Sequence, residues 1–348
     1  MKILYIITGR YPTERAYGIQ IERTIQAMRI FGAEVEVKLP MPFMQKLLYL
    51  GKFGYWLRTL IFIKLLFLSS NLNDYDALYT RDPLAAYALS FMNNKVFLEL
   101  HDISSPRLVK QAAKRVRGIV VISKGLCNRL VQLEIEENKI LIAPDGVDYP
   151  KFAINLDKES ARKEFNLPLD KKIVLYAGLF DEWKGYRTLL EASKLFSPDT
   201  LLVMAGGRPE QVNELKEQFA NVQFLGWTPY EKLPILQRAV DVLVLPNSAK
   251  PDISRLYTSP LKLFAYMCSG VPIVVSDLPS LREIVDENMV TFAVPDDPKS
   301  LAHTIANVLE NTSLAKSKAL RACEVVKKFT WQSRAHAILT FIKSCESQ

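Results

Sequence analysis

Two lysine-containing segments have the residue types that bind phosphate groups. The first, GLFDEWKG at 178–185, follows an apolar run and precedes a helical pattern. A lysine after such a strand can neutralise a diphosphate as a point charge, and the N–H groups at a helix start can donate to the same anion. Lysine–glycine pairs also occur in ordinary turns. This segment alone is therefore weak evidence for an anion site around Lys184. A second phosphate-binding segment would strengthen it.

The second segment, YTSPLK, contains a helix start. Thr258 or Ser259 can cap the helix, and Pro260 suits its first position. The backbone N–H groups of Leu261 and Lys262 then lack partners inside the helix, and the lysine adds a positive charge. An ordinary helix start shows the same pattern. Two candidate anion sites in one half of the chain nevertheless favour a ligand that carries phosphate.

Other ligand motifs are weak or absent in the sequence. Gly18, shortly after the first apolar run, could let the backbone approach a ligand closely. No GxGxxG follows that run, so the fingerprint of nicotinamide dinucleotide sites is missing. DYD at 74–76 spells the metal-binding DxD motif, and we interpret it as a turn before a strand. The three histidines and four cysteines have no ligand spacing, so no metal site is expected.

The composition is typical of a globular protein in a reducing compartment. Hydrophobic residues make up 49% of the 348 residues. The cysteines lie far apart and MKILYIITG is too short for a signal peptide, which favours a cytoplasmic protein. The net charge of +8 suits an anionic ligand, an anionic membrane or nucleic acid. The basic residues are dispersed and no aromatic–basic RNA motif occurs, so nucleic acid is not expected as a partner.

Apolar runs alternate with helical patterns, which predicts parallel strands covered on both faces by helices. A helix is expected near 20–31, and a polar stretch at about 145–171 is interpreted as a linker. Strands are expected at 2–7, 35–39, 77–80, 96–100 and 118–122, and in a second set at 173–177, 201–205, 222–225, 242–245 and 273–275. The predicted fold class is α/β, with two Rossmann-like domains.

The segment 41–70 is strongly apolar, and no acidic residue occurs between Glu36 and Asp74. Its cations are Lys46, Lys52, Arg58 and Lys64. They interrupt the apolar run too often for a helix that spans a membrane. Two interpretations stay open: an element that lies on an anionic membrane surface with snorkelling cation stems, or a pair of packed helices with solvated lysines.

Taken in order, these segments resemble glycosyltransferase family 4, a retaining family with the GT-B fold. The resemblance covers almost the whole chain, and the order and spacing of its blocks make it specific. The blocks are VISK at 121–124, IAPDGVD at 142–148, LYAG at 175–178, KG at 184–185, FLG at 224–226, DVLVLP at 241–246, SPLKLF at 259–264, SGVPIV at 269–274, SDLP at 276–279 and FTW at 329–331.

The resemblance implies two Rossmann-like domains with parallel sheets that face each other across a cleft. Residues 1–150 would form the acceptor-side domain and 151–329 the nucleotide-sugar domain, with a helix at 330–348 packing back on the first. The implied reaction is transfer of a sugar, with retention, from a nucleotide-diphosphate donor to a hydroxyl of a saccharide or lipid-linked saccharide. Neither a metal nor another cofactor would be required, and the protein would be cytoplasmic or peripheral on the inner membrane face.

The same resemblance assigns site residues. His101, in ELHD after the expected strand at 96–100, is the catalytic candidate and would hydrogen-bond the donor sugar. Lys184 matches the lysine that binds diphosphate, and Gly226 and Trp227 lie where the family places the nucleobase. The other matched donor-binding positions are Gly18, Gly178, Thr258, Ser259, Pro260, Leu261 and Lys262.

Three positions depart from the family pattern. Leu179 replaces an arginine, and Tyr257 and Ala265 stand where the family has two glutamates. The second glutamate usually binds the ribose hydroxyls through charge-assisted hydrogen bonds. Alanine there is either an engineered inactivating change or a natural feature of a protein that binds its donor differently or is inactive. The alternative functions are a degenerate binder of nucleotide-sugar or of a partner, and a GT-B epimerase or phosphorylase.

Overall fold

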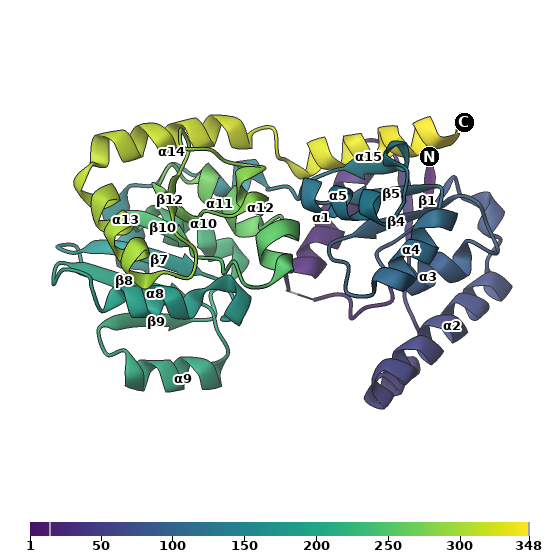
Figure 1. The fold of residues 1–348 in the computed structure, drawn as a ribbon, viewed down its shortest axis with the longest axis horizontal. Helices are drawn as coiled ribbons and strands as arrows, with labels where there is room; N and C mark the ends of the chain where they lie inside the picture. The colour runs from purple at the N-terminus through teal and green to yellow at the C-terminus, as the bar shows by residue number, and fades with distance from the viewer. Residues whose placement is uncertain (14, 347–348) are drawn as a thin grey trace. The chain divides into compact units, whose positions relative to one another are not determined.

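A computed structural model describes residues 1–13 and 15–346 of the chain. The chain forms two compact α/β units (Figure 1). Unit 1 consists of Met1–Gly146 together with Trp331–Gln348, and unit 2 consists of Val147–Thr330.

Unit 1 contains a six-stranded parallel sheet with the order β2-β1-β3-β4-β5-β6. Its central strands are buried on both faces, as expected for apolar runs without polar alternation. The strands are β1 (Lys2–Ile6), β2 (Glu34–Lys38), β3 (Ala77–Thr80), β4 (Val96–Leu100), β5 (Gly118–Val121) and β6 (Ile140–Ile142). The helices are α1 (Ala16–Ile30), α2 (Gly51–Ser69), α3 (Pro83–Leu89), α4 (Pro106–Arg115), α5 (Lys124–Gln132) and α15 (Trp331–Glu346), with short 3₁₀ segments η1 (Pro42–Leu50), η2 (Leu72–Asp74) and η3 (Glu137–Lys139).

The last helix, α15, completes the cover of this sheet. It buries Ala335, Ile338 and Ile342 and packs along α1. The ring of Phe341 lies edge-on to Phe97 of β4, with centroids 6.2 Å apart. This arrangement confirms the expectation that the C-terminal helix returns to the amino-terminal domain.

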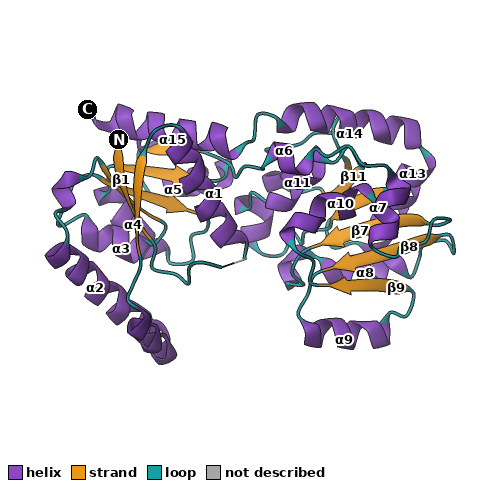
Figure 2. Ribbon diagram, turned by 180° about the vertical axis from the view of Figure 1, so that it is seen from behind, coloured by secondary structure: helices purple, strands orange, loops and turns teal. Residues whose placement is uncertain are grey.

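Unit 2 contains a second six-stranded parallel sheet, with the order β12-β11-β10-β7-β8-β9 (Figure 2). Successive residues of β7 enter two different cores: Leu175 lies on one face of the sheet, and Val174 and Tyr176 on the other. The strands are β7 (Lys172–Ala177), β8 (Thr200–Ala205), β9 (Val222–Gly226), β10 (Val242–Leu245), β11 (Ile273–Ser276) and β12 (Thr291–Ala293). The helices are α6 (Tyr149–Phe152), α7 (Lys158–Glu164), α8 (Tyr186–Ser193), α9 (Pro209–Gln218), α10 (Leu233–Arg238), α11 (Leu261–Cys268), α12 (Pro279–Arg282), α13 (Pro298–Glu310) and α14 (Thr312–Val326), with short segments η4 (Glu182–Lys184), η5 (Tyr230–Lys232) and η6 (Ile253–Tyr257).

Two sheets of parallel strands with intervening helices confirm the predicted α/β class. The interpretation of 145–171 as a linker is wrong, because this stretch forms α6 and α7. Phe152 and Ala161 from these helices are buried in the core of unit 2. Their few apolar residues are spaced too widely for sequence periodicity to show. The edge strands β6 and β12 were not predicted, since each has three residues.

The apolar segment after β2 forms η1 and α2, which pack against each other. Helix α2 buries Phe62, Ile63 and Leu66 within unit 1. Large apolar side chains remain exposed on the two elements: Phe43, Tyr49, Leu50, Phe53, Trp56, Leu60, Phe67 and Leu68. In the described part of the chain, no helix is both long and apolar enough to cross a membrane.

Candidate functional site

Each parallel sheet changes winding direction at one point, where ligands bind in folds of this kind. In unit 2 this point lies between β7 and β10, which pair directly. Gly178 follows β7, and the η4 turn with Lys184 comes next. Gly185 has a left-handed φ of 67°, and a β-carbon there would lie 1.7 Å from the carbonyl oxygen of Pro246 after β10. Only glycine permits this approach, which holds the lysine turn against β10.

Lys262, in the first turn of α11, carries a buried ammonium group beside this turn. Its Nζ has no hydrogen-bond partner among the residues that the structure describes. The ring of Tyr176 lies under it, 4.1 Å from Nζ to the ring centroid. Burial, together with the positive charge of Lys184, lowers the pKa of Lys262 well below its usual range. A buried cation without a hydrogen-bond acceptor is costly, so this position is suited to a negatively charged ligand.

The position of Lys262 depends on its neighbours in α11 and β7. The hydroxyl of Tyr266, one helical turn along, accepts a hydrogen bond of 3.0 Å from the backbone N–H of Ala177. This bond joins the second turn of α11 to the end of β7. A β-carbon on Gly178 would lie 2.8 Å from Nζ of Lys262, so the glycine leaves room for the ammonium.

Lys184 contributes a second, more accessible cation. Its Nζ lies 2.8 Å from the carboxylate of Asp181 in the same turn and 5.1 Å from the centre of the Trp183 ring. The positive charge of Lys184 contributes to the lowered pKa of Lys262. The structure therefore brings together the two anion-binding segments expected from the sequence.

The helix start differs from the expectation in one detail. Pro260 has an extended backbone and is the N-cap, whereas the sequence predicted it as the first helical residue. The N-cap accordingly has no side-chain capping bond, and Thr258 and Ser259, predicted as caps, are buried before it. The first helical N–H groups, on Leu261 and Lys262, have no acceptor within the helix.

The remaining predicted positions of unit 2 lie on nearby elements. Gly226 ends β9 with a left-handed φ of 69°, and Trp227 after it exposes 63% of its surface. Tyr257 ends η6 and is half-buried. Ala265 is buried in α11, one turn beyond Lys262. A residue three positions along a helix lies on the same side, so position 265 is on the face of α11 that carries Lys262.

Unit 1 has its own cavity, of about 1050 Å³, at the carboxyl ends of β1, β3 and β4. His101 lines it just beyond β4, together with Arg81 and Asp82 beyond β3. Tyr55 and Trp56 of α2 form another part of the wall. The cavity thus combines aromatic surface with charged and hydroxyl groups.

His101 is held from beneath by a buried carboxylate. Its Nε2 lies 2.5 Å from Oε1 of Glu99, and Nε of Arg81 lies 3.7 Å from the same oxygen. Burial and the nearby Arg81 charge lower the pKa of His101 despite the attraction of Glu99. The imidazole is therefore neutral at neutral pH and suited to hydrogen bonding with an uncharged group.

Two sequence motifs have structural explanations. A β-carbon on Gly18 would lie 2.2 Å from the carbonyl oxygen of Thr13, so this glycine accommodates the chain itself. Asp76 of DYD accepts a hydrogen bond of 2.6 Å from the backbone N–H of Lys2, and Asp74 accepts one from Asn71. Over residues 1–13 and 15–346, no group of three or more potential metal-ligating side chains gathers in one place.

Comparison with known proteins finds one matching family model and several distant relatives. The family model described as Glycosyl transferases group 1 matches residues 157–322, most of unit 2. A phosphatidyl-myo-inositol mannosyltransferase of Mycobacterium leprae is 24% identical over 286 residues, which are 76% of this chain and 72% of that protein. These matches support a glycosyltransferase of group 1. The family and the names of the relatives indicate a glycosyltransferase.

Other relatives match over a smaller part of their length. A D-inositol 3-phosphate glycosyltransferase of Corynebacterium urealyticum is 23% identical over 224 residues. These residues are 59% of this chain and 51% of that protein, so the chain spans about half the length of this relative.

Solved structures of glycosyltransferases establish the fold as GT-B. The Anabaena protein Alr3699/HepE, solved in complex with UDP, aligns with a TM-score of 0.79 at 18% identity, over 99% of this chain and 100% of that one. A sucrose-phosphate synthase of Thermosynechococcus elongatus aligns with a TM-score of 0.82 at 18% identity over 100% of both chains.

Sequence reasoning missed the side chains that hold the proposed site residues in place. Tyr176 and Tyr266 have only the pattern of buried core aromatics, and their tilt toward Lys262 or Ala177 has no sequence signature. Glu99 could have been noticed, since it is an acidic residue inside the otherwise apolar run VFLEL. Arg334, which lies 235 positions later in the chain, gave no signal of its pairing with Glu99.

The burial of Lys262 leads to a stability prediction. We expect Lys262→Met to raise the free energy of unfolding of unit 2 by about 1 kcal/mol or more in the absence of an anion, because an unsatisfied buried group is removed. For a domain of this size the melting temperature should rise by about 2–4 °C per kcal/mol. Differential scanning calorimetry measures the change, and Lys194→Met, at an exposed lysine of the same unit, is the control.

A second measurement compares the unaltered protein with Lys262→Met: the pH dependence of the free energy of unfolding. Because the pKa of Lys262 is lower in the folded protein than in the unfolded chain, the unfolded state binds more protons between these two values. The free energy of unfolding of the unaltered protein should therefore rise with pH in that window. Lys262→Met should lack this rise. An identical pH dependence in both proteins would show that the ammonium is not destabilised by burial.

Proposed function

We propose that the chain transfers a sugar from a nucleotide-diphosphate donor to a hydroxyl acceptor, with retention at the anomeric carbon. The observation that carries this proposal is the buried, unpartnered ammonium of Lys262 beside Lys184. The described residues offer this ammonium an aromatic ring but no hydrogen-bond acceptor, and Asp181, the carboxylate that attracts it, is already paired with Lys184. A diphosphate would supply further negative charge. The helix N–H groups of Leu261 and Lys262 would add hydrogen bonds to the same group.

The choice of donor is supported by structures of the same fold. Alr3699/HepE was solved with UDP, with UDP and glucose, and with UDP-glucose. By analogy, the exposed Trp227 and the open backbone at Gly226 form the proposed nucleobase site. Gly178, Thr258, Ser259 and Pro260 shape the proposed diphosphate site around the two lysines.

The proposed chemistry uses the lysines in place of a metal. As the glycosidic bond breaks, negative charge grows on the leaving diphosphate, and fixed cations and helix N–H groups stabilise it. His101 is proposed to hydrogen-bond the reacting sugar with its neutral imidazole. Retention follows from the family resemblance, and the leaving oxygen is proposed to help remove the acceptor proton. Turnover that persists in excess chelator is expected.

The cavity of unit 1 is the proposed acceptor site. Its volume of about 1050 Å³ is sufficient for more than one sugar ring. Aromatic walls suit the faces of sugar rings, and the polar groups of Thr8, Arg81 and Asp82 suit their hydroxyls. Helix α2 contributes Lys52, Tyr55 and Trp56 to the cavity wall.

The same helix supports a lipid-linked acceptor and peripheral membrane binding. Exposed aromatic and aliphatic side chains cover η1 and α2, and Lys46, Lys52 and Lys64 are exposed among them. Arg58 is instead buried and bonds the carbonyl oxygen of Thr8, so it is not a membrane contact. Apolar side chains with exposed cations and no acidic neighbour are the combination that binds anionic lipid surfaces.

A second candidate function is donor binding without turnover, and Ala265 is the observation that favours it. The methyl group at this buried position offers no hydrogen bond to ribose hydroxyls. Such a protein would bind nucleotide-sugar or a partner and release no nucleoside diphosphate.

Ligand-induced thermal stabilisation tests donor binding. We expect one of UDP, GDP and ADP, with a matching nucleotide-sugar, to raise the melting temperature with ligand concentration. Lys262→Met should lose this rise, because the diphosphate loses its buried cation, whereas Lys194→Met should keep it. Absence of stabilisation by all three diphosphates and their sugars would contradict the proposal. Release of nucleoside diphosphate in the presence of an acceptor extract distinguishes the transferase from the binder.

The alanine in α11 leads to a gain-of-function prediction. Ala265→Glu should tighten donor binding about ten-fold or more, because a charge-assisted hydrogen bond contributes about 1.5–3 kcal/mol. Titration calorimetry with the stabilising nucleotide-sugar measures the affinity, and the transfer assay measures turnover. Ala265→Gln is the control of equal size without charge. Equal affinities for the Glu and Gln variants would show that no carboxylate is missing at this position.

Vesicle flotation tests the membrane proposal. The protein should float with phosphatidylglycerol-containing vesicles and less with pure phosphatidylcholine. Joint neutralisation of Lys46, Lys52 and Lys64 to glutamine should weaken flotation, and the weakening should diminish at high salt. Neutralising the exposed Lys163, Lys194 and Lys327 of unit 2 is the matched control. Failure of the unaltered protein to float would refute membrane binding.

A further inference from the structure

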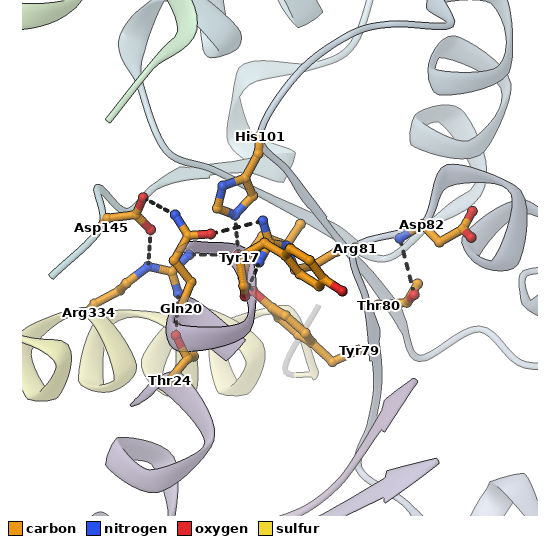
Figure 3. A network of polar contacts seen from close by, with 11 residues as sticks. Tyr17, Gln20, Thr24, Tyr79, Thr80, Arg81, Asp82, His101, Asp145 and Arg334 are labelled. Atoms are coloured by element: carbon orange, nitrogen blue, oxygen red, sulfur yellow. Dashed lines mark hydrogen bonds and ion pairs between the residues drawn. The ribbon is translucent and has the colours of Figure 1, made fainter. Parts of the chain in front are cut away.

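Beneath the cavity of unit 1 lies a buried cluster of charged and polar side chains (Figure 3). Glu99 of β4 is at its centre, and Arg334 reaches it from α15. Asp145, just after β6, and Gln20 of α1 form its other side, joined by a hydrogen bond of 2.5 Å. Segments far apart in the sequence thus meet directly under His101.

Glu99 pairs with several groups at once. Nη2 of Arg334 lies 3.0 Å from Oε1, the oxygen that also faces Nε2 of His101. The hydroxyl of Tyr79 donates a hydrogen bond to the other oxygen, Oε2. Both carboxylate oxygens therefore have partners, which restricts rotation of the Glu99 side chain.

The arginine is equally enclosed. Arg334 exposes 2% of its side chain, and Nε lies 4.0 Å from Oδ1 of Asp145. Its Nη1 lies 3.4 Å from the hydroxyl of Thr24 in α1. Nη2 approaches Glu99 as an ion pair without the alignment of a hydrogen bond. Helix α15 therefore inserts a fixed positive charge below the histidine.

These charges determine the protonation of Glu99 and His101. Burial alone would raise the pKa of Glu99, but the charge of Arg334 and the hydrogen bond from His101 hold it well below its usual range. A carboxylate can only accept hydrogen bonds. The charged groups that face the imidazole are Glu99, Arg81 and Asp145, and burial with Arg81 keeps it neutral. A neutral imidazole beside a carboxylate places its one proton on the nitrogen that faces that carboxylate.

We propose that Glu99 and Arg334 are positioning residues that fix His101 as the Nε2–H tautomer, leaving Nδ1 as a hydrogen-bond acceptor for a sugar hydroxyl. The role of the hydroxyl rests on the proposed function. The tautomer itself rests only on the contacts within unit 1. Arg334 acts through Glu99: it keeps the carboxylate charged and stationary, and so holds both the proton and the ring.

Nuclear magnetic resonance of ¹⁵N-labelled histidine tests the tautomer on the full chain without substrate. The chain has three histidines, so His303→Gln and His336→Gln assign the signals. The unaltered protein should show protonated Nε2 and unprotonated Nδ1 for His101. In Glu99→Leu the fixed pattern should be lost, because no acceptor remains. A protonated Nδ1 in the unaltered protein, or an unchanged pattern in Glu99→Leu, would overturn the proposal.

Kinetics separate positioning from a merely structural role. Arg334→Met should lower kcat ten-fold or more with less than two-fold change in the donor KM, and Arg334→Lys should recover most of the loss.

Glu99→Gln should move the acidic limb of the pH profile of kcat/KM to lower pH. The anion that stabilises the imidazolium form of His101 is then gone, while the positive charge of Arg81 remains. Arg162→Met is the matched control, since Arg162 is a buried arginine paired with Asp241 in unit 2.

The Arg162→Met control distinguishes a positioning role of Arg334 from a merely structural one. If Arg162→Met lowers thermal stability like Arg334→Met but leaves kcat and the His101 signals unchanged, the positioning role stands. If both arginine variants lower kcat alike, or if the pH profile of Glu99→Gln is unchanged, the role is refuted. An unaltered protein that transfers no sugar refutes the proposed function alone, because the tautomer is read in the absence of substrate.

Discussion

The burial of one ammonium group constrains the site of unit 2. Lys262 projects from the first turn of α11 into a space bounded by an aromatic ring and by a glycine whose missing side chain makes the room. Tyr266 ties the same helix to the end of β7. The apolar surroundings of the ammonium raise the energy of the free protein, and the proposed diphosphate would lower it again. Stability and binding are thus in opposition at this residue.

The buried charge of unit 1, the carboxylate of Glu99, differs from Lys262 because it has partners within the protein. Glu99 is surrounded by partners from β3, α15 and the turn after β4, so its charge is satisfied before any ligand arrives. The result is a rigid histidine at the rim of a roomy cavity. Unit 2 therefore holds a buried ammonium without a hydrogen-bond partner, whereas the buried carboxylate of unit 1 is paired and contacts the imidazole of His101. The two arrangements suit the binding of a strongly anionic group and of an uncharged one, respectively.

The fold was largely predictable because parallel sheets buried on both faces leave long apolar runs in the sequence. Ten of the twelve strands follow such runs, and the two missed strands lie at sheet edges and have three residues each. The lysines of the candidate site were also recognisable from helix starts and glycines. The supporting residues were not, because the pairing of Glu99 with Arg334 joins distant segments. Helix start positions depend on local backbone angles, which explains the one-residue error at Pro260.

The return of α15 to unit 1 has a consequence for synthesis on the ribosome. All of unit 2, Val147–Thr330, is translated before Arg334 emerges. Until then the nascent amino-terminal unit has Glu99 without its arginine, and the apolar surface that α15 later covers stays exposed. Unit 2 is one continuous stretch and can fold in the meantime, since domains generally fold as units. The unit made first is therefore the one completed last.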